Sequence, residues 1–143
     1  MNNIAWLARR FHVFAIPGNG RYRVRPVAVT DLADLCVRLG ADRVDSTVDA
    51  VGPEAFTFQE MVGTIAHGVG AWYLPVHLPP ALVGVLLRGL AGVTNDVVLT
   101  RDEIDGLMAE LVYVDGPTRL TDYLRTNGSR VGKHYHSELA RRR

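Results

Sequence analysis

The sequence predicts a single α+β domain over residues 1–143, mostly helical with a few short strands. Apolar residues recur every three or four positions in several stretches, which is the spacing of one face of a helix. The motifs Thr57–Glu60 and Thr100–Glu103 match capping boxes, in which a threonine and a glutamate satisfy backbone donors at a helix start. Between the helices, short β-prone runs end at glycine and proline clusters, as strands commonly do.

The N-terminal part is expected to contain two helices and two strands. The elements are a helix from the capping Asn2 or Asn3 to Arg10, strands at 12–16 and 22–29 around the turn Pro17–Gly20, and a helix that begins at Thr30 or Asp31 and closes at Gly40. Pro26 has no amide hydrogen for a ladder bond, so the second strand is predicted to be bent or at an edge. Cys36 falls in the apolar pattern of the second helix and is predicted to be an inert core thiol.

The remaining chain is predicted to be largely helical. In order, the elements are a β-prone run at 46–51, a helix from Thr57 to a stop at Gly70, an extended piece at 72–77, an apolar helix from Pro79–Pro80 to about Leu90 that Gly92 ends, a helix opened by Thr100–Glu103, and a polar helical tail at 118–143 with a break at Asn127–Gly128. All of these elements are assigned to one domain.

Composition excludes several classes of protein. The formal net charge of +1 creates no field that would gather nucleic acid or anionic lipid over the whole surface, so such a partner needs a local patch. The single cysteine allows no internal disulfide, which is consistent with a cytoplasmic protein. The longest apolar stretch, Leu78–Val93, is interrupted by prolines and an arginine and falls short of the ~20 residues that span a bilayer.

No complete catalytic, cofactor or metal site is predicted within the chain. A dinucleotide site needs a glycine-rich turn between a strand and a helix, whereas Gly18-Asn19-Gly20 leads into a strand. The sequence also has no phosphate-binding loop, no Gly-x-Ser-x-Gly turn and no histidines at metal-ligand spacing. His77, beside Leu78-Pro79-Pro80, is interpreted as a helix-entry residue rather than a general base.

Several segments carry a family resemblance. A glycine turn, a strand and a capped helix follow one another in Gly18–Ala33, and the asparagine-led Asn2–Ile4 precedes them. Val48–Glu60 then combines a strand, a Gly-Pro pair and a Thr-x-x-Glu helix, and Leu74–Pro80 is rich in leucine and proline. These segments resemble the NAD(P)-dependent epimerase/dehydratase family of extended short-chain dehydrogenase/reductases, especially the branch related to the NADH-dehydrogenase accessory subunit. The family motif is matched at Gly18, Gly20, Val29, Asp31 and Ala33.

This resemblance implies that the chain is the C-terminal, substrate-binding portion of a Rossmann-type NAD(P)-binding protein. In the family, the glycine-rich fingerprint and the catalytic Tyr-x-x-x-Lys pair lie before the matched region. The chain is therefore expected to lack the N-terminal nucleotide-binding half and to be inactive alone. NAD(P) is the cofactor implied for a complete oxidoreductase, which would transfer hydride to or from a carbonyl or alcohol. The alternative is a non-catalytic assembly or interaction module derived from the same fold.

The resemblance also implies where a substrate would bind. The candidate contacts are Asn2 or Asn3, Tyr22, Arg23 and Arg25. The family arginine that holds a nucleotide-sugar phosphate aligns with Val24, and strand alternation turns the flanking arginines to the other face, which argues against such a substrate. The expected partners are a small-molecule substrate and, through exposed strand edges, another copy of the chain. Nucleic acid is not an expected partner.

Overall fold

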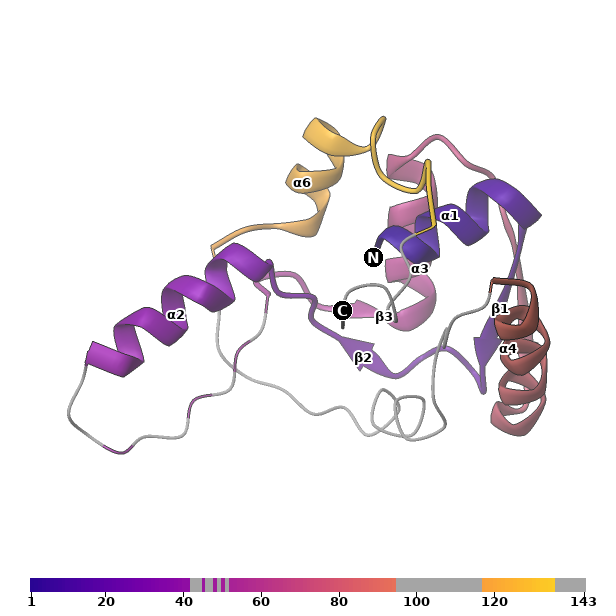
Figure 1. The fold of residues 1–143 in the computed structure, drawn as a ribbon, viewed down its shortest axis with the longest axis horizontal. Coiled ribbons are helices and arrows are strands. Elements are labelled where there is room, and N and C mark those ends of the chain that lie inside the picture. The colour runs from indigo at the N-terminus through magenta and orange to yellow at the C-terminus, as the bar shows by residue number, and fades with distance from the viewer. Residues whose placement is uncertain (42–44, 46–47, 49, 51, 95–116, 136–143) are drawn as a thin grey trace.

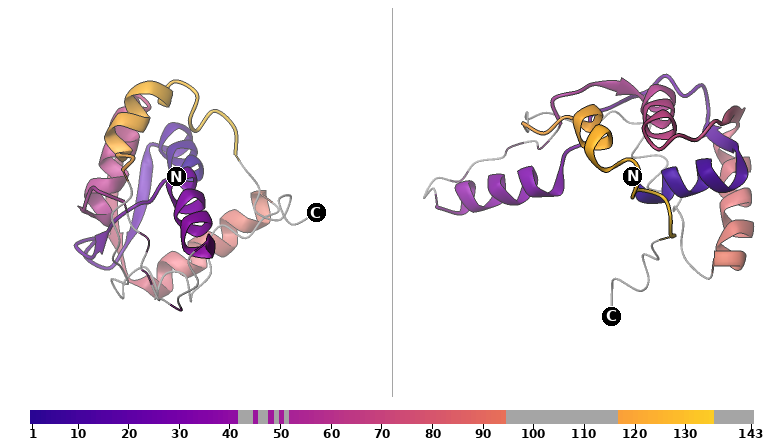
Figure 2. Two further views of the ribbon diagram at one scale, coloured as in Figure 1. Left: turned by 90° about the vertical axis from the view of Figure 1, so that its left-hand side faces the viewer. Right: turned by 90° about the horizontal axis from the view of Figure 1, so that it is seen from above.

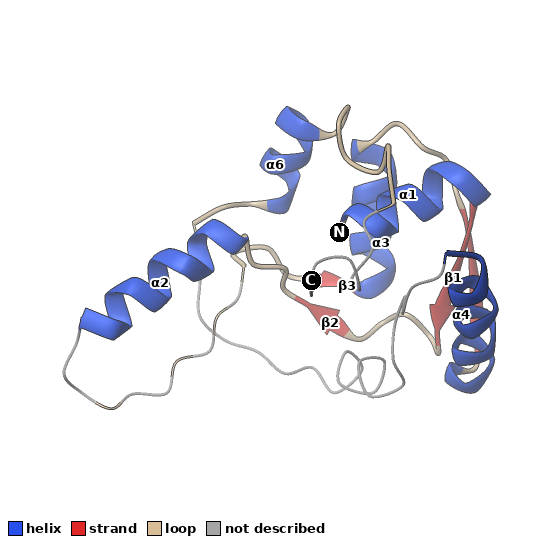
Figure 3. Ribbon diagram, viewed as in Figure 1, coloured by secondary structure: helices blue, strands red, loops and turns tan. Residues whose placement is uncertain are grey.

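The computed structural model describes residues 1–41, 45, 48, 50, 52–94 and 117–135 (Figure 1). Its elements are α1 (Asn2–Phe11), β1 (Val13–Pro17), β2 (Arg23–Val24), α2 (Val29–Ala41), β3 (Phe56–Thr57), α3 (Phe58–Gly68), β4 (Leu74–Leu78), α4 (Pro80–Thr94) and α6 (Leu120–Asn127). Helices predominate over short strands in this part of the chain, so the expected mixed α and β composition is confirmed (Figure 3).

Strands β1 and β4 form a parallel pair, in which Val13 lies opposite Leu74 and Pro17 lies opposite Leu78. Phe14 and Ile16 of β1 pack against Phe58 and Val62 of α3, which lies on one side of the pair. Helix α4 contacts β1, and in Figure 1 the strands lie between α3 and α4. A parallel pair covered by helices is the local arrangement of α/β sheets, in which both faces are buried.

The second strand pair is small and antiparallel. Arg23 lies opposite Thr57, and Val24 lies opposite Phe56. The strand expected over 22–29 is therefore formed in the ladder at Arg23–Val24 alone. The bend predicted from Pro26 fits this early end, because residues 25–28 leave the ladder.

The predicted capping box at the start of α3 is confirmed. The Thr57 side chain accepts a hydrogen bond from the Glu60 amide at 3.2 Å, and the Glu60 carboxylate accepts one from the Thr57 amide at 2.8 Å. The backbone hydrogen bond from Thr57, followed by that of its side chain, lowers the pKa of Glu60 below its ordinary value. The predicted stop is confirmed as well, because Gly70 adopts a positive φ of 69° directly after the helix.

A second apolar cluster joins the two ends of the described chain. It contains Ala5 of α1, Ile65 and Val69 of α3, Leu120 and Leu124 of α6, and Val131. Helices α3 and α6 approach closely at two glycines that leave no room for a side chain. A Cβ at Gly68 would lie 2.9 Å from the Cβ of Leu124, and one at Gly128 would collide with the carbonyl oxygen of Gly68. The segment 120–131 therefore contributes side chains to the core, although it was expected to be a polar tail. The helix expected from Ser129 is wrong for residues 129–134, which form turns and bends.

The predicted cap of the first helix is wrong. Met1 is the N-cap residue of α1 and makes no side-chain capping bond, while Asn2 and Asn3 lie inside the helix. Asn2 instead accepts a hydrogen bond from the Gly132 amide at 2.9 Å and donates one to the His134 carbonyl at 2.8 Å. Its amide therefore fixes the C-terminal turns against α1.

Helix α2 differs most from its prediction. It begins at Val29, before the expected cap, and continues through Gly40 to Ala41 without the expected left-handed glycine. None of its residues is buried, and Cys36 is exposed, so the predicted core thiol is wrong. Figures 1 and 2 show α2 projecting away from the other helices, which explains why its apolar face has no core to enter.

Two carboxylates hold the start of α6. Asp31 of α2 accepts hydrogen bonds from the amide and hydroxyl of Thr118 at 2.8 and 2.7 Å. Glu54 accepts from the amide and hydroxyl of Thr121 at 3.0 and 2.6 Å and pairs with Arg119 at 3.3 Å. The predicted role of Asp31 as the cap of its own helix is therefore replaced by a contact with a distant segment.

Other expectations have mixed outcomes. The strand at 12–16 and the extended piece at 72–77 are confirmed as β1 and β4, and the helix after Pro79–Pro80 is confirmed as α4, which passes the expected stop at Gly92. The helix opened by Thr100–Glu103 and most of the β-prone run at 46–51 lie outside the described residues. No helix in the described part of the chain has both the length and the apolar character needed to cross a membrane.

Candidate functional site

The strongest candidate site lies at the carboxyl ends of β1 and β4. In open parallel sheets, ligands bind beyond this edge because the loops there carry exposed side chains and free backbone donors. The turn after β1 is fixed by a hydrogen bond from the Gly18 amide to the Leu78 carbonyl at 2.8 Å. Asn19 accepts a bond from the Arg21 amide at 3.0 Å within the same turn.

Gly20 closes this turn at a position where any side chain would be strained. Its φ is +65°, and an added Cβ would lie 2.6 Å from Cγ2 of Ile16. Its carbonyl accepts a hydrogen bond from the amide of Gln59 at 3.2 Å. The turn is therefore packed against the first turn of α3.

The side chain of Gln59 meets His77 at the end of β4. The Gln59 Oε1 and His77 Nε2 atoms are 2.9 Å apart, and His77 donates this hydrogen bond in the tautomer that carries its hydrogen on Nε2. His77 is exposed, and its Nε2 lies 3.5 Å from where a Cβ of Gly20 would stand. We call Gly18, Asn19, Gly20, Gln59 and His77 the carboxyl-end cluster.

The carboxyl-end cluster can bind and orient a polar ligand through an imidazole and amide groups. Among the described residues, no carboxylate hydrogen-bonds to His77, and no three His, Cys, Asp or Glu side chains are grouped to hold a metal ion. This arrangement therefore lacks the acid that orients the histidine in a catalytic triad. Within the described chain, the arrangement supports recognition of a polar ligand through hydrogen bonds.

Tyr22, a predicted substrate contact, is a core residue. Its ring stacks on Phe58 with centroids 5.3 Å apart, and its side chain is buried. Burial raises the pKa of the Tyr22 phenol, and its hydroxyl is buried without a hydrogen-bond partner among the described residues. The structure thus gives this residue a packing role beside the carboxyl-end cluster.

The predicted arginine contacts lie on either side of the buried Val24. Arg23 is exposed on β2, and Arg25 donates from Nε to the Gly52 carbonyl at 3.1 Å. The amide of Gly52 returns a hydrogen bond to the Arg25 carbonyl at 3.2 Å. Arg25 therefore fixes the loop before β3, whereas Asn2 and Asn3 lie on α1 beside the C-terminal turns.

The sequence interpretation missed Gln59 as a functional candidate and assigned His77 to helix entry. A signal for both existed, because each occupies the junction of a strand or turn with the start of a helix. What the sequence did not reveal is that β1 and β4 are parallel neighbours. That pairing brings the turn after one strand next to the last residues of the other.

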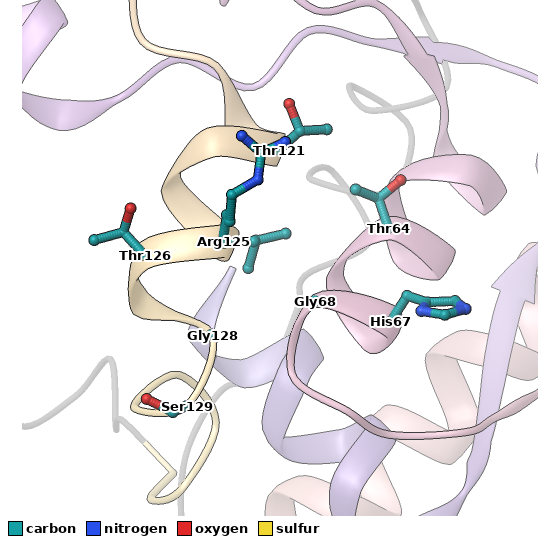
Figure 4. Close-up of a pocket in the computed structure, with 9 residues that line it drawn as sticks. Thr64, His67, Gly68, Thr121, Arg125, Thr126, Gly128 and Ser129 are labelled. Carbon is teal, nitrogen blue, oxygen red and sulfur yellow. The ribbon is translucent and has the colours of Figure 1, made fainter.

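A separate shallow cavity of about 340 Å³ lies between α3 and α6 (Figure 4). Its walls include Thr64, His67, Thr121, Arg125 and Ser129. Arg125 pairs with Asp122 at 3.2 Å, and Figure 4 shows the side chains of His67 and Arg125 extending in different directions. Because its polar groups do not converge, this cavity is a weaker candidate than the carboxyl-end cluster.

No protein-family model matches the chain, and no curated protein sequence matches it. The likeness to the epimerase/dehydratase family is therefore carried by the quoted motifs alone and stays a prediction.

Proposed function

We propose that this chain is the substrate-binding part of an NAD(P)-dependent epimerase/dehydratase-like oxidoreductase with a Rossmann-type sheet. The observation that supports this best is the parallel β1–β4 pair, in which α4 contacts β1 and α3 packs against the buried side chains of β1. Two strands alone are marginal, and parallel strands occur almost entirely in larger sheets with helices on both faces. The pair is the kind of unit that further parallel strands would extend.

The proposed role of this chain is to bind and orient a small-molecule substrate. In the complete protein, NAD(P) would accept or donate the hydride. Here, His77 at the end of β4 and Gln59 in the first turn of α3 would contact hydroxyl or carbonyl groups, since they meet at the edge of the sheet where ligands bind. Arg23 and Arg25 remain proposed contacts, and the bond of Arg25 to Gly52 would position the loop before β3.

Among the residues that the structure describes, the glycine turn does not fit the pyrophosphate of NAD(P). At the second glycine of the turn, Gly20, an added Cβ would lie 2.6 Å from Cγ2 of Ile16 and 3.4 Å from Cβ of Gln59, so this side of the turn is filled by protein and leaves no room for a phosphate. The turn also leads into β2 and not into a helix whose amides could face an anion. The cofactor would therefore be held by another part of the protein.

NADH titration tests this division of labour. Residues 1–143 alone should give no change in NADH fluorescence, whereas the complete gene product should bind NADH. In that product, His77→Ala should weaken substrate binding and leave NADH binding unchanged. A complete gene product with neither a glycine-rich fingerprint nor a Tyr-x-x-x-Lys pair would contradict the proposal, as would micromolar NADH binding by residues 1–143.

The second candidate function is a non-catalytic assembly module. The exposed apolar side chains of α2 favour it, because Val29 is 81% and Val37 74% exposed. Large apolar patches on a monomer commonly mark interaction sites. Light scattering discriminates the two candidates, since an assembly module that pairs with itself would show a concentration-dependent mass that Val29→Ser and Val37→Ser reduce.

A further inference from the structure

The parallel pair β1–β4 leaves one edge of β1 without a neighbouring strand. The Leu74 amide donates to the His12 carbonyl at 2.8 Å, and Leu74 lies opposite Val13. In a parallel ladder, alternate residues of a strand bond to the same neighbour, so this bond determines which residues of β1 face β4. Residues 14 and 16 direct their backbone groups toward β4, and the residues between them direct theirs to the opposite side.

The outward groups of β1 are the amides of Val13 and Ala15 and the carbonyls of Val13, Ala15 and Pro17. Within the part of the chain that the structure describes, none of these groups makes a hydrogen bond. The Val13 side chain is also 48% exposed. A row of unpaired amides and carbonyls along a strand is a template for a further strand.

The outer edge of β4 is a weaker template. Its outward residues are Pro75 and His77, and Pro75 has no amide hydrogen to donate. Only the His77 amide can donate along that edge, whereas β1 offers the amides of both Val13 and Ala15. A strand that joins the pair therefore gains more hydrogen bonds beside β1 than beside β4.

The edge of β1 is complementary to a second copy of itself. When two β1 strands run antiparallel with Ala15 opposite Ala15, each Ala15 amide donates to the Ala15 carbonyl of the other copy. Val13 then lies opposite Pro17, so the Val13 amide donates to the Pro17 carbonyl, and the amide that Pro17 lacks leaves only the Val13 carbonyl unbonded. The Val13 side chain gains Pro17 as a neighbour, because residues opposite each other point to the same face.

The helices on the two faces of the sheet are compatible with this pairing. Phe14 and Ile16 face α3, while α4 contacts β1. A two-fold axis normal to the sheet keeps α3 of both copies on one face and α4 of both copies on the other. A helix is ~10 Å wide and strands are ~4.8 Å apart, so each α4 covers its own pair of strands. A second copy thus also brings an apolar helix beside the exposed Leu82, Val85 and Leu86, which an added strand alone would not do.

We propose that this chain forms a symmetric dimer in which the β1 strands of two copies pair antiparallel about Ala15. The two parallel pairs join into one sheet with the strand order β4-β1-β1-β4, which relieves the marginal stability of two strands alone. This inference goes beyond the proposed oxidoreductase function and does not rest on it, since it uses neither the carboxyl-end cluster nor a cofactor. The further parallel strands of a complete oxidoreductase would add beyond β4, where the His77 amide faces outward.

Light scattering of residues 1–143 over a series of concentrations tests for the dimer. The mass should rise with concentration toward twice that of one chain. Ala15→Pro should raise the dissociation constant of the dimer at least about tenfold, because it removes the hydrogen bonds between the two Ala15 residues. It removes no bond within the chain, since the Ala15 amide faces away from β4. His77→Pro makes the same change on the outer edge of β4 and should leave the dimer unchanged.

A pair of cysteine variants tests the register of the two strands. In a Cys36→Ser background, Ala15→Cys should form a disulfide-linked dimer with oxidised glutathione, because the two Cα atoms at position 15 would be about 5.5 Å apart. Val13→Cys in the same background should stay unlinked, since the two copies of this residue would be about 14 Å apart along the strands. Electrophoresis without reducing agent separates the two outcomes.

Several outcomes would overturn the proposal. One is a chain that stays monomeric at every concentration, which would leave the NADH titration as a separate test of the oxidoreductase function. Another is a dimer that Ala15→Pro leaves intact, and dissociation by Val37→Ser would then place the interface on α2. A third is cross-linking of Val13→Cys as readily as of Ala15→Cys. Circular dichroism checks that Ala15→Pro is folded, and the cysteine pair decides if it is not.

Discussion

Helices α2 and α3 have similar sequence patterns and opposite environments. Both place apolar residues every three or four positions, yet Val62 and Ile65 of α3 are fully buried while no residue of α2 is buried. The pattern of a helix fixes which face is apolar, but another element must lie against that face before it is buried. Helix α3 lies against α1, β2, β3 and α6, and α2 projects from them (Figure 1).

The prediction with the largest expected effect truncates one apolar residue in each of these two helices. Ile65→Ala should reduce the free energy of unfolding by about 2–5 kcal/mol, since Ile65 is 1% exposed at the centre of the cluster shared by α1, α3 and α6. Leu32→Ala in α2 should cost less than about 1 kcal/mol, because Leu32 already contacts water. Urea unfolding of both variants measures the difference, and equal costs would show that α2 is packed in solution.

A second test compares two glycines. Gly128→Ala should cost about 1–3 kcal/mol, because the new Cβ would meet the backbone carbonyl of Gly68, which cannot turn aside as a flexible side chain would. Gly40→Ala should stabilise the protein by about 0.5–1 kcal/mol, since Gly40 lies within α2 and no heavy atom lies within 4 Å of the added Cβ. Thermal unfolding reports both signs. A neutral Gly128→Ala would contradict the close approach of α3 and α6.

Local features of the sequence predicted local features of the fold. The capping box at Thr57 and the strand before Pro17-Gly18 depend on residues that are neighbours in the chain, so their chemistry is readable there. The contact of Asp31 with Thr118 joins residues that are 87 positions apart, and the sequence near either residue gives no indication of it. The same holds for Asn2, whose expected local cap is replaced by bonds to Gly132 and His134.

The candidate site was predictable to a smaller degree. The turn at Gly18–Gly20 was identified, but its neighbours Gln59 and His77 come from a helix and a strand much further along the chain. Burial also determines the role of Tyr22. Strand alternation places Tyr22 on the same face as Val24, but it does not show that this face is buried in the core. The pairing of segments that are far apart in the sequence is therefore what could not be predicted at this site.

The smallest expected effect concerns the carboxylates at the start of α6. Glu54→Gln should reduce the free energy of unfolding at neutral pH by about 1 kcal/mol. Glu54 accepts a hydrogen bond from the Thr121 amide in the first turn of α6, and it therefore caps this helix although it lies far from it in the sequence. Asp31→Asn should have a smaller effect, since Asp31 ties the projecting α2 to Thr118 and supports no buried cluster.

The pH dependence of stability provides the check on this last prediction. Partial burial acts to raise the pKa of Glu54, but hydrogen bonds from Thr121 and Arg119 outweigh it, so the pKa lies below its ordinary 4.5. The amide of Thr118, followed by its hydroxyl, likewise lowers the pKa of Asp31. A carboxyl group whose pKa is lowered by folding stabilises the protein above its unfolded pKa, and that contribution disappears as the pH falls through the folded value. The deficit of Glu54→Gln relative to the wild-type protein should therefore be constant from pH 7 down to near 4.5 and vanish in more acidic solution. A deficit that persists unchanged in acid would mean that Glu54 contributes through packing alone and not through its charge.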